Sequence, residues 1–344
     1  MRVNNFNSPV DEPGCTFTSM RIAEILLEQP PHPFWQMLKQ IGVDEAVGVL
    51  PRYLSDWRGA GGEAPWSYVP LALYAEQVKD SGMSLVVIED NPPMDLLRLG
   101  LPGREEELAT VCTLIENMGK LGIGVWCYNW MPIIGWTRTS VGIRSRGGAL
   151  VTAFDLGVVA DAPPAVGESI EAEQLWDSLG WFLERVLPVA EAAGVTLAMH
   201  PDDPPLPSLR GIARIMSSVD AFERLLALDP SPCNAITLCQ GNFTLMTDDL
   251  PSSIRAFGDR IAFVHFRDVR GTAERFVETF VDDGQTNMAD CMRAYAEIGF
   301  AGPARSDHNP ALEGDRGQVA GYSHLGRLHA VGYMAGLRDA MYGS

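Results

Sequence analysis

Four residues of types that bind metal ions stand at the ends of short apolar runs in the second half of the chain. His200 follows VTLAM, Cys239 follows AITL, His265 lies within IAFVHFRD and Asp307 follows PARS. Two imidazoles, a thiol and a carboxyl group suit a first-row divalent cation such as Mn2+, Fe2+, Co2+ or Zn2+ better than Mg2+ or Ca2+. A single buried His or Cys is more often a core residue, but four of them at successive strand ends predict a shared metal site.

These residues can share one site only if the strands that precede them lie side by side. Apolar runs of strand length alternate along the chain with longer segments of helical spacing. The predicted strands cover residues 21–27, 46–50, 85–88, 124–128, 195–199, 235–238, 261–266 and 304–306. The predicted helices cover residues 104–121, 171–193, 220–228, 249–257, 288–298 and 325–341. Gly122, Gly194, Gly258 and Gly299 stand just after helical segments, where left-handed residues end helices.

This alternation predicts a parallel sheet, and eight strand–helix units fit an α/β fold of the (β/α)8 TIM barrel type with enlarged loops. An open, doubly wound sheet is the alternative, but no G-x-G-x-x-G sequence follows the first strand. In a barrel the carboxyl ends of the strands meet at one mouth, which would bring the four ligands together. Residues 129–168 and 267–285 are too long for ordinary turns, and we expect them to cover that mouth as lid or substrate-contact loops.

The composition excludes several classes of partner. With 26 Lys and Arg against 44 Asp and Glu, the formal net charge of −18 repels nucleic acids and anionic membranes. The cysteines show neither zinc-knuckle spacing nor the density of a disulfide scaffold. The sequence begins without a secretory signal, and no apolar stretch approaches the ~20 residues of a membrane helix. We therefore expect a cytoplasmic protein with a flexible lead at residues 1–19 and one barrel domain at residues 20–344.

Several strings resemble the mannonate dehydratase family: RLGLPGREEE (98–107), CYNWMP (127–132), WTRT (136–139), HPDDPP (200–205), CQGN (239–242), VHFRD (264–268), ETF with DDG (278–284) and RSDHNP (305–310). The family consists of metal-dependent barrels of the xylose-isomerase-like type that convert D-mannonate to 2-keto-3-deoxy-D-gluconate and water. The resemblance implies this fold and hydro-lyase reaction, a role in hexuronate catabolism, and His200, Cys239, His265 and Asp307 as ligands of Mn2+ or Fe2+. Barrels of this kind often form homo-oligomers, which we expect by analogy.

Such a dehydration needs one group that takes the proton from C2 and another that protonates the hydroxyl leaving C3. His308 directly follows Asp307 and titrates near neutral pH, so it is a candidate for one of these groups. Tyr322, in GYSHLGR after the last strand, is a candidate for the other. His308 could instead orient Asp307, and Tyr322 could be a packing residue, so the sequence leaves the two roles open.

Candidate substrate contacts surround the predicted ligands. Arg267 and Arg305 are expected to bind the substrate carboxylate, because a guanidinium does so bidentately. Asp202, two residues after His200, could bind sugar hydroxyls or support a ligand. Tyr128 and Asn129, at the end of the fourth strand, are further candidate substrate contacts. Tyr128 belongs to an aromatic group with Trp126, Trp130 and Trp136 that lines a sugar pocket or packs in the core.

Three positions depart from the family pattern. Gly135, Val281 and Asn287 stand where the family has Asp, His and Asp. These changes put the identity of the sugar acid in question more than the metal site, because specificity depends on pocket contacts. Besides a dehydratase of D-mannonate or another aldonic acid, the sequence allows a metal-dependent isomerase or epimerase. It also allows a metal-bound barrel that has lost catalysis and has a binding role.

Overall fold

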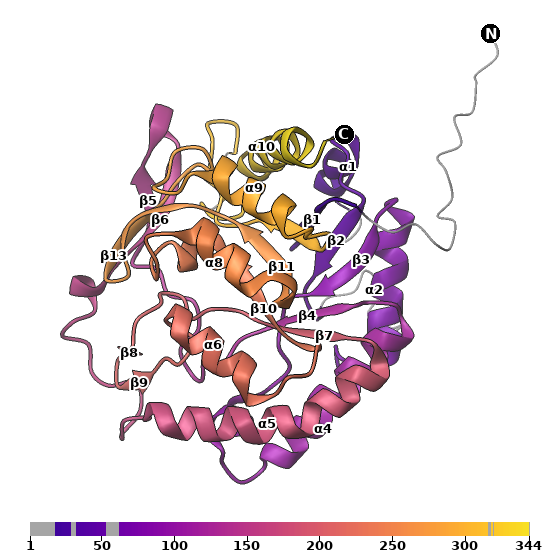
Figure 1. Ribbon diagram of the computed structural model, residues 1–344, viewed down its shortest axis with the longest axis vertical. Coiled ribbons are helices and arrows are strands. Elements are labelled where there is room, and N and C mark those ends of the chain that lie inside the picture. The colour runs from indigo at the N-terminus through magenta and orange to yellow at the C-terminus, as the bar shows by residue number, and fades with distance from the viewer. Residues whose placement is uncertain (1–17, 29–31, 53–61, 316–317, 319, 344) are drawn as a thin grey trace.

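The computed structural model describes residues 18–28, 32–52, 62–315, 318 and 320–343. Its centre is a closed barrel of eight parallel strands in the order β1-β14-β11-β10-β7-β4-β3-β2 (Figure 1). This confirms the predicted (β/α)8 barrel, and the closure excludes the open-sheet alternative. The predicted lead at residues 1–19 falls almost wholly outside the described residues.

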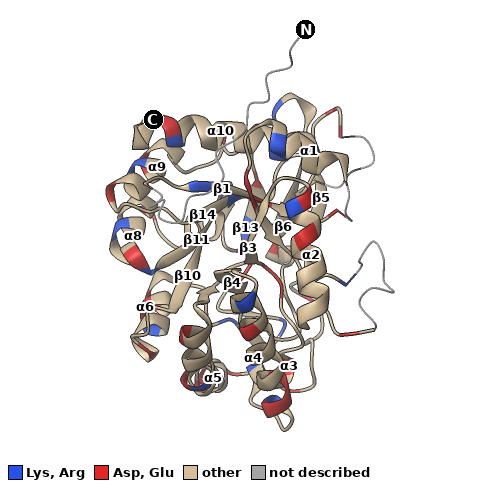
Figure 2. Cartoon of the chain, turned by 90° about the vertical axis from the view of Figure 1, so that its right-hand side faces the viewer, with Lys and Arg blue, Asp and Glu red and all other residues tan. Residues whose placement is uncertain are grey.

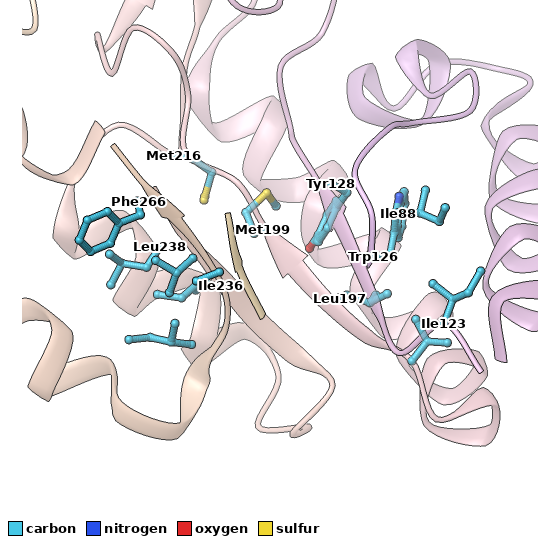
Figure 3. Packing of buried hydrophobic residues seen from close by; sticks show 14 of the residues in the cluster. Ile88, Ile123, Trp126, Tyr128, Leu197, Met199, Met216, Ile236, Leu238 and Phe266 are labelled. Atoms are coloured by element: carbon cyan, nitrogen blue, oxygen red, sulfur yellow. The ribbon is translucent and has the colours of Figure 1, made fainter. Parts of the chain in front are cut away.

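The barrel strands agree with the predicted ones to within about one residue at most ends. They are β1 (Arg21–Leu26), β2 (Glu45–Gly48), β3 (Ser84–Ile88), β4 (Val125–Tyr128), β7 (Thr196–Met199), β10 (Asn234–Cys239), β11 (Ile261–Phe266) and β14 (Pro303–Ser306). Alternate residues of the strands form two cores, because successive side chains of a strand point to opposite faces. One core consists of small interior residues such as Ala23, Val47 and Ala198. The other joins the outer faces to the helices, and Figure 3 shows part of it around Trp126 and Leu238.

The helices surround the barrel, and charged residues are more frequent on the helices than on the barrel strands (Figure 2). They are α1 (Pro33–Gln40), α2 (Tyr68–Asp80), α3 (Asp95–Leu99), α4 (Arg104–Lys120), α5 (Ala172–Ala193), α6 (Val219–Leu228), α7 (Gln240–Phe243), α8 (Leu250–Phe257), α9 (Met288–Glu297) and α10 (His324–Tyr342). The six predicted helices are confirmed. Gly194 ends α5 with φ +69°, as its position predicted, because glycine adopts the left-handed conformation without a Cβ clash.

The two long loops contain strands that the sequence did not predict. β5 (Ser140–Arg144) and β6 (Leu150–Asp155) follow β4, and β12 (Val269–Thr272) and β13 (Arg275–Glu278) follow β11. They form one antiparallel sheet in the order β12-β13-β6-β5, and a short pair, β8 (Ser208–Leu209) and β9 (Ile212–Ala213), follows β7. Both loops therefore start from the carboxyl ends of barrel strands, as predicted. Their strands pair with one another across the two loops, through β13 and β6. None of the described helices is long and apolar enough to cross a membrane.

Candidate metal centre and active site

The four predicted metal ligands come from four barrel strands that are neighbours in space. His200 directly follows β7, Cys239 ends β10, His265 lies near the end of β11, and Asp307 directly follows β14. All four side chains are buried. Ligand atoms of His200, Cys239 and His265 lie within 4.8 Å of one another, and Asp307 Oδ2 is 3.7 Å from His265 Nδ1. The fold therefore brings together the four residues that their positions at successive strand ends predicted as ligands.

The hydrogen bonds of the two histidines show that this cluster fits a cation. His200 Nδ1 lies 2.7 Å from the carbonyl oxygen of Pro201, and His265 Nε2 lies 3.2 Å from Glu89 Oε2. A carbonyl and a carboxylate only accept hydrogen bonds, so each ring carries its proton on that outer nitrogen. The two inner nitrogens, His200 Nε2 and His265 Nδ1, then present lone pairs to each other across 3.2 Å. A metal ion between the ligands would relieve this repulsion.

Cys239 also needs positive charge nearby before it can bind a metal ion. Burial is the main reason that the pKa of its thiol rises to about 12. The thiolate, which is the metal-binding form, therefore needs cations nearby. Arg267 Nη1 is 3.5 Å from the sulfur, and a metal ion would supply the remaining charge. The donor set of two nitrogens, one sulfur and one carboxylate oxygen suits a transition-metal dication.

Arg267 and Arg305 hold carboxylates beneath the mouth and do not extend into it. Each is 1% exposed. Arg267 donates to Glu278 at 2.7 and 2.9 Å and to Asp203 at 3.0 Å. Arg305 donates to Glu89 at 2.6 Å and to Asp307 Oδ1 at 3.0 Å. Because these bonds engage both guanidiniums, we assign the two arginines to orienting the ligands rather than to the predicted grip on a substrate carboxylate.

A third arginine extends this charged cluster to the antiparallel sheet. Arg138, just before β5, donates to both oxygens of Asp203 at 2.7 and 2.8 Å and to Glu278 Oε1 at 2.7 Å. We call Arg138, Arg267, Asp203 and Glu278 the buried charge cluster; the two acids are fully buried. The motifs WTRT and ETF contain Arg138 and Glu278, but only the fold reveals that they are partners. Sequence reasoning therefore missed them, as it missed Glu89.

The two predicted proton carriers lie on either side of Asp307. Tyr322 donates its hydroxyl proton to Asp307 Oδ1 at 3.0 Å, and His308 Nε2 is 3.8 Å from Asp307 Oδ2. The rings of His308 and Tyr322 are 5.5 Å apart. His308 Nδ1 is buried without a hydrogen-bond partner among the described residues. Beside the predicted metal ligands there is therefore one phenol that is bonded to Asp307 and one imidazole nitrogen that makes no hydrogen bond to a described residue and lies 3.7 Å from Glu278 Oε1.

Backbone pairing holds both proton carriers in place. His308 has a φ of +49°, which is uncommon for a residue other than glycine. The next residue, Asn309, exchanges two backbone hydrogen bonds with Gly321, next to Tyr322, at 2.7 and 2.8 Å. Asn309 Nδ2 also donates to Ser306 Oγ at 2.9 Å, and Ser306 Oγ donates to Glu24 at 2.6 Å. The two carriers are therefore fixed to each other and to the barrel wall.

Two predicted substrate contacts are buried among other protein groups. The Tyr128 ring stacks on Trp126 at 4.9 Å and approaches Phe182 of α5, so it belongs to the layer between barrel and helices (Figure 3). Strand alternation explains this: Cys127 faces the barrel interior, and Tyr128 therefore faces outward. Asp202 is fully buried and accepts a hydrogen bond from the Met216 amide at 2.8 Å. It supports the loop after β7, and burial raises its pKa to about 6.

The three departures from the family pattern have different surroundings. Val281 is buried in the core. Asn287 caps α9, because its side chain accepts hydrogen bonds from two amides of the first turn. Gly135 lines a pocket that Asn129 and Trp136 also line. Gly135 and Asn287 therefore each line a pocket, and the Gly135 pocket is the one whose wall residue Trp136 lies beside His200, with 6.0 Å between the ring centroids.

The closed parallel barrel, with its predicted nitrogen, sulfur and oxygen ligands at the strand ends, has the xylose-isomerase-like TIM-barrel fold. The same fold occurs in a xylose isomerase domain protein from Planctomyces limnophilus, with a TM-score of 0.60 and 10% identity over 95% of this chain and 99% of that one. A much stronger match is the crystal structure of mannonate dehydratase from Streptococcus suis serotype 2. It has a TM-score of 0.84 and 29% identity over 94% of this chain and 93% of that one.

The chain belongs to the D-mannonate dehydratase (UxuA) family, whose model matches residues 36–167 and 164–343. Mannonate dehydratase 2 from Halalkalibacterium halodurans is 32% identical over 305 residues, which cover 80% of this chain and 88% of that protein. Mannonate dehydratase from Streptococcus agalactiae serotype III is 33% identical, with 80% and 87% covered. These findings confirm the resemblance first seen in the sequence strings.

Proposed function

We propose that the protein is a hydro-lyase that converts D-mannonate to 2-keto-3-deoxy-D-gluconate and water. Family membership supports this reaction. The observation that carries it in this chain is the pair His308 and Tyr322, which flank Asp307 beside a cluster of inward-facing ligand atoms. That arrangement offers what a dehydration needs, namely two proton carriers next to a cation site.

We propose Mn2+ or Fe2+ as the metal, with Co2+ or Zn2+ as alternatives for the same donor set. A dication held by His200, Cys239, His265 and Asp307 would act as a Lewis acid that stabilises negative charge developing on the sugar acid. Glu89 and the Pro201 carbonyl keep the two histidines in the tautomers that such binding requires. Elemental analysis of the purified protein identifies the bound metal.

For proton transfer we propose that His308 takes the proton from C2 and that Tyr322 protonates the hydroxyl that leaves C3. His308 Nδ1 makes no hydrogen bond to a described residue, although Glu278 Oε1 lies 3.7 Å away, and this supports its role as the base. Burial lowers the pKa of the ring and so favours its neutral form. Tyr322 is suited to the role of acid, because burial raises the pKa of its phenol and keeps the proton on it. The water that is released consists of the C3 hydroxyl and the Tyr322 proton. The C2 proton on His308 then passes to the Tyr322 phenolate through solvent, which restores both residues and balances the reaction.

Incubation of the metal-loaded protein with D-mannonate tests the reaction, with the 2-keto-3-deoxy acid as the product measured. No product with Mn2+, Fe2+ or Co2+ would contradict the proposal. Exchange of the C2 proton without loss of water would instead favour an isomerase or epimerase, and binding without exchange would favour a non-catalytic protein. In deuterated buffer, we expect Tyr322→Phe to retain C2 exchange and His308→Asn to lose it.

We further propose that residues 20–344 act as one catalytic domain in a cytoplasmic homo-oligomer, with a small sugar acid rather than nucleic acid or membrane as partner. The free thiols among the described residues support a reducing compartment. The outer strand of the antiparallel sheet, β5, supports self-association, because Val141 and Ile143 are exposed on it. Light scattering of the purified protein tests the oligomeric state.

A further inference from the structure

A pocket of about 410 Å3 lies over the carboxyl ends of β2, β3 and β4. We call it the side pocket, and its walls include Arg52, Trp66, Asn91, Asn129, Ile133 and Trp136. The metal ligands come from the other strands, β7, β10, β11 and β14. The side pocket and the ligand cluster therefore occupy different halves of the same barrel mouth, with β4 and β7 as neighbours between them.

The side pocket begins next to a metal ligand. Trp136 lines the pocket, and its ring centroid lies 6.0 Å from that of His200. The His200 amide donates to the carbonyl of Tyr128 at 2.7 Å, and Asn129, the next residue, lines the pocket as well. A molecule bound at the metal therefore needs to extend by only a few atoms to enter the side pocket.

Two polar groups in the side-pocket wall have no partner within the described part of the chain. Asn129 Oδ1 accepts from Arg98 and from the Met131 amide, both at 3.1 Å, which fixes the orientation of the amide group. Its Nδ2 then faces the other way and donates no hydrogen bond to a described residue. Asn91 Oδ1 is buried without a partner. A buried acceptor without a partner is costly, and hydroxyl groups can satisfy both Asn91 Oδ1 and Asn129 Nδ2 because they donate and accept.

The charge in the side pocket is balanced. Arg52 is paired with Asp90, and Arg98 with Asp95. A carboxylate entering the pocket would find no surplus positive charge, whereas neutral hydroxyls would meet no such penalty. Trp66 and Trp136 add flat apolar surface, which suits the C–H groups of a sugar chain. The composition of the wall therefore fits a neutral polyhydroxy chain.

The loop that forms one wall is held in a costly conformation. Ile133 has a φ of +64°, which is a strong exception for a β-branched residue, and it is 43% exposed. The strain is maintained by neighbours, because Arg214 binds the carbonyl oxygens of Ile134 and Gly135 at 3.1 and 3.0 Å. Such conformations persist where the surroundings over-determine them, and they are common at ligand-binding sites.

We propose that the side pocket binds the C4–C6 hydroxyl end of an aldonic acid whose C2 and C3 lie at the metal centre. This inference rests on the proposed function, because the dehydration changes bonds only at C2 and C3. The carboxylate and the reacting carbons then stay with the ligand cluster, and the neutral remainder of the chain satisfies Asn91 and Asn129. The side pocket would thereby distinguish a six-carbon acid from shorter ones.

Gly135→Leu is the sharpest test, because it fills space without removing a contact. Gly135 lines the side pocket, and an added Cβ would meet no atom within 4 Å. We expect kcat/KM for D-mannonate to fall at least tenfold, while that for a four-carbon aldonic acid of the same C2 and C3 configuration changes less than twofold. The matched control is Gly336→Leu, an exposed glycine of α10 that also has open space around its Cβ.

Asn129→Asp is a second variant, which removes one donor and adds a negative charge beside Arg98. A carboxylate keeps the acceptor for Arg98 and Met131 but loses the N–H group that faces the pocket. We expect KM for D-mannonate to rise about tenfold and metal content to stay unchanged. Equal effects on the six-carbon and four-carbon acids in both variants would overturn the proposal while the proposed function stands.

Calorimetric titration of both acids into the metal-loaded protein separates the two proposals when turnover is absent. If the wild type converts no aldonic acid, the proposed function fails, but the side pocket still predicts tighter binding of the six-carbon acid. It also predicts that Gly135→Leu removes that difference. Equal affinity of the wild type for both acids would overturn the side-pocket proposal by itself.

Discussion

The two halves of the barrel mouth are built on different principles. Around β7, β10, β11 and β14, charged side chains are paired with one another, and Arg267 alone binds Glu278, Asp203 and Asn242. Around β2, β3 and β4, Asn91 Oδ1 and Asn129 Nδ2 make no hydrogen bond within the described part of the chain, and the loop at Ile133 is strained. The first half positions groups for chemistry in advance, and the second leaves partners for a ligand to supply.

The difference also concerns energy. Buried ions are stable only when their partners are present, so removing one member of the buried charge cluster leaves an uncompensated charge. The polar groups of the side pocket lose their partners whenever the ligand leaves. Variants of the ligand half should therefore affect metal binding, catalysis or folding, whereas variants of the other half should affect which substrate is used.

The largest effect is expected from the metal ligands themselves. Cys239→Ser and His265→Ala should each lose the metal and abolish activity, since each removes one of four donors. Metal content measured by elemental analysis and activity on D-mannonate check this together. Cys233→Ser is the control, because Cys233 lies just before the opposite end of the same strand, β10. Full metal occupancy in both ligand variants would refute the assignment.

His308→Asn should keep the metal and lose turnover by roughly two to four orders of magnitude, the usual contribution of a general acid or base. Asn retains a polar side chain but cannot accept the C2 proton. Steady-state kinetics at matched metal content give the measurement. A rate close to that of the wild type would remove His308 from the mechanism.

Glu278→Gln should destabilise the fold by about 3–5 kcal/mol. The variant leaves Asp203 as the carboxylate that Arg138 and Arg267 share, so one buried positive charge is uncompensated. Urea unfolding followed by circular dichroism measures the change. Glu173→Gln is the control, because Glu173 pairs with Arg224 on the exposed surface and should leave the midpoint unchanged. Similar midpoints for the two variants would show that the buried charge cluster does not hold the ligand half together.

Asn309→Ala should lower kcat about tenfold with little change in KM or metal content, since small displacements of positioned groups are costly. It removes the side-chain bond to Ser306 that steadies His308 and Tyr322. Asn234→Ala is a matched control. Asn234 is also a buried amide that makes two hydrogen bonds, but it lies at the start of β10, the end opposite to Cys239. If both variants lose stability alike and keep kcat, Asn309 has only a structural role.

The smallest effect is expected for Tyr128→Phe. The hydroxyl is buried without a partner among the described residues, so its removal should change stability by less than about 1 kcal/mol and leave kinetics unaltered. Thermal unfolding and the KM for D-mannonate are the two readouts. A clear rise in KM would restore the sequence prediction that Tyr128 contacts the substrate.

Much of the fold could be predicted because its signals are local. The apolar runs, the helical spacing and glycines such as Gly194 depend on residues close in sequence, and each predicted strand and helix is present. The proximity of the four predicted ligands followed from the same signals, because a parallel barrel collects the carboxyl ends of its strands. The sheet formed by β5, β6, β12 and β13 was missed, because its two hairpins lie more than 100 residues apart and pair only in the folded state.

The sequence by itself thus determined the order of strands, the residue types at their ends and the chemistry that those types allow. Tertiary structure alone decided which partners each charged side chain binds and which way each side chain faces. Arg267 and Arg305 bind buried acids because those acids are within reach, and Tyr128 faces outward because Cys127 faces inward. Ionic and hydrogen-bond partners are chosen by distance in space, and residues such as Arg138 and Glu278 become neighbours only when the chain has folded.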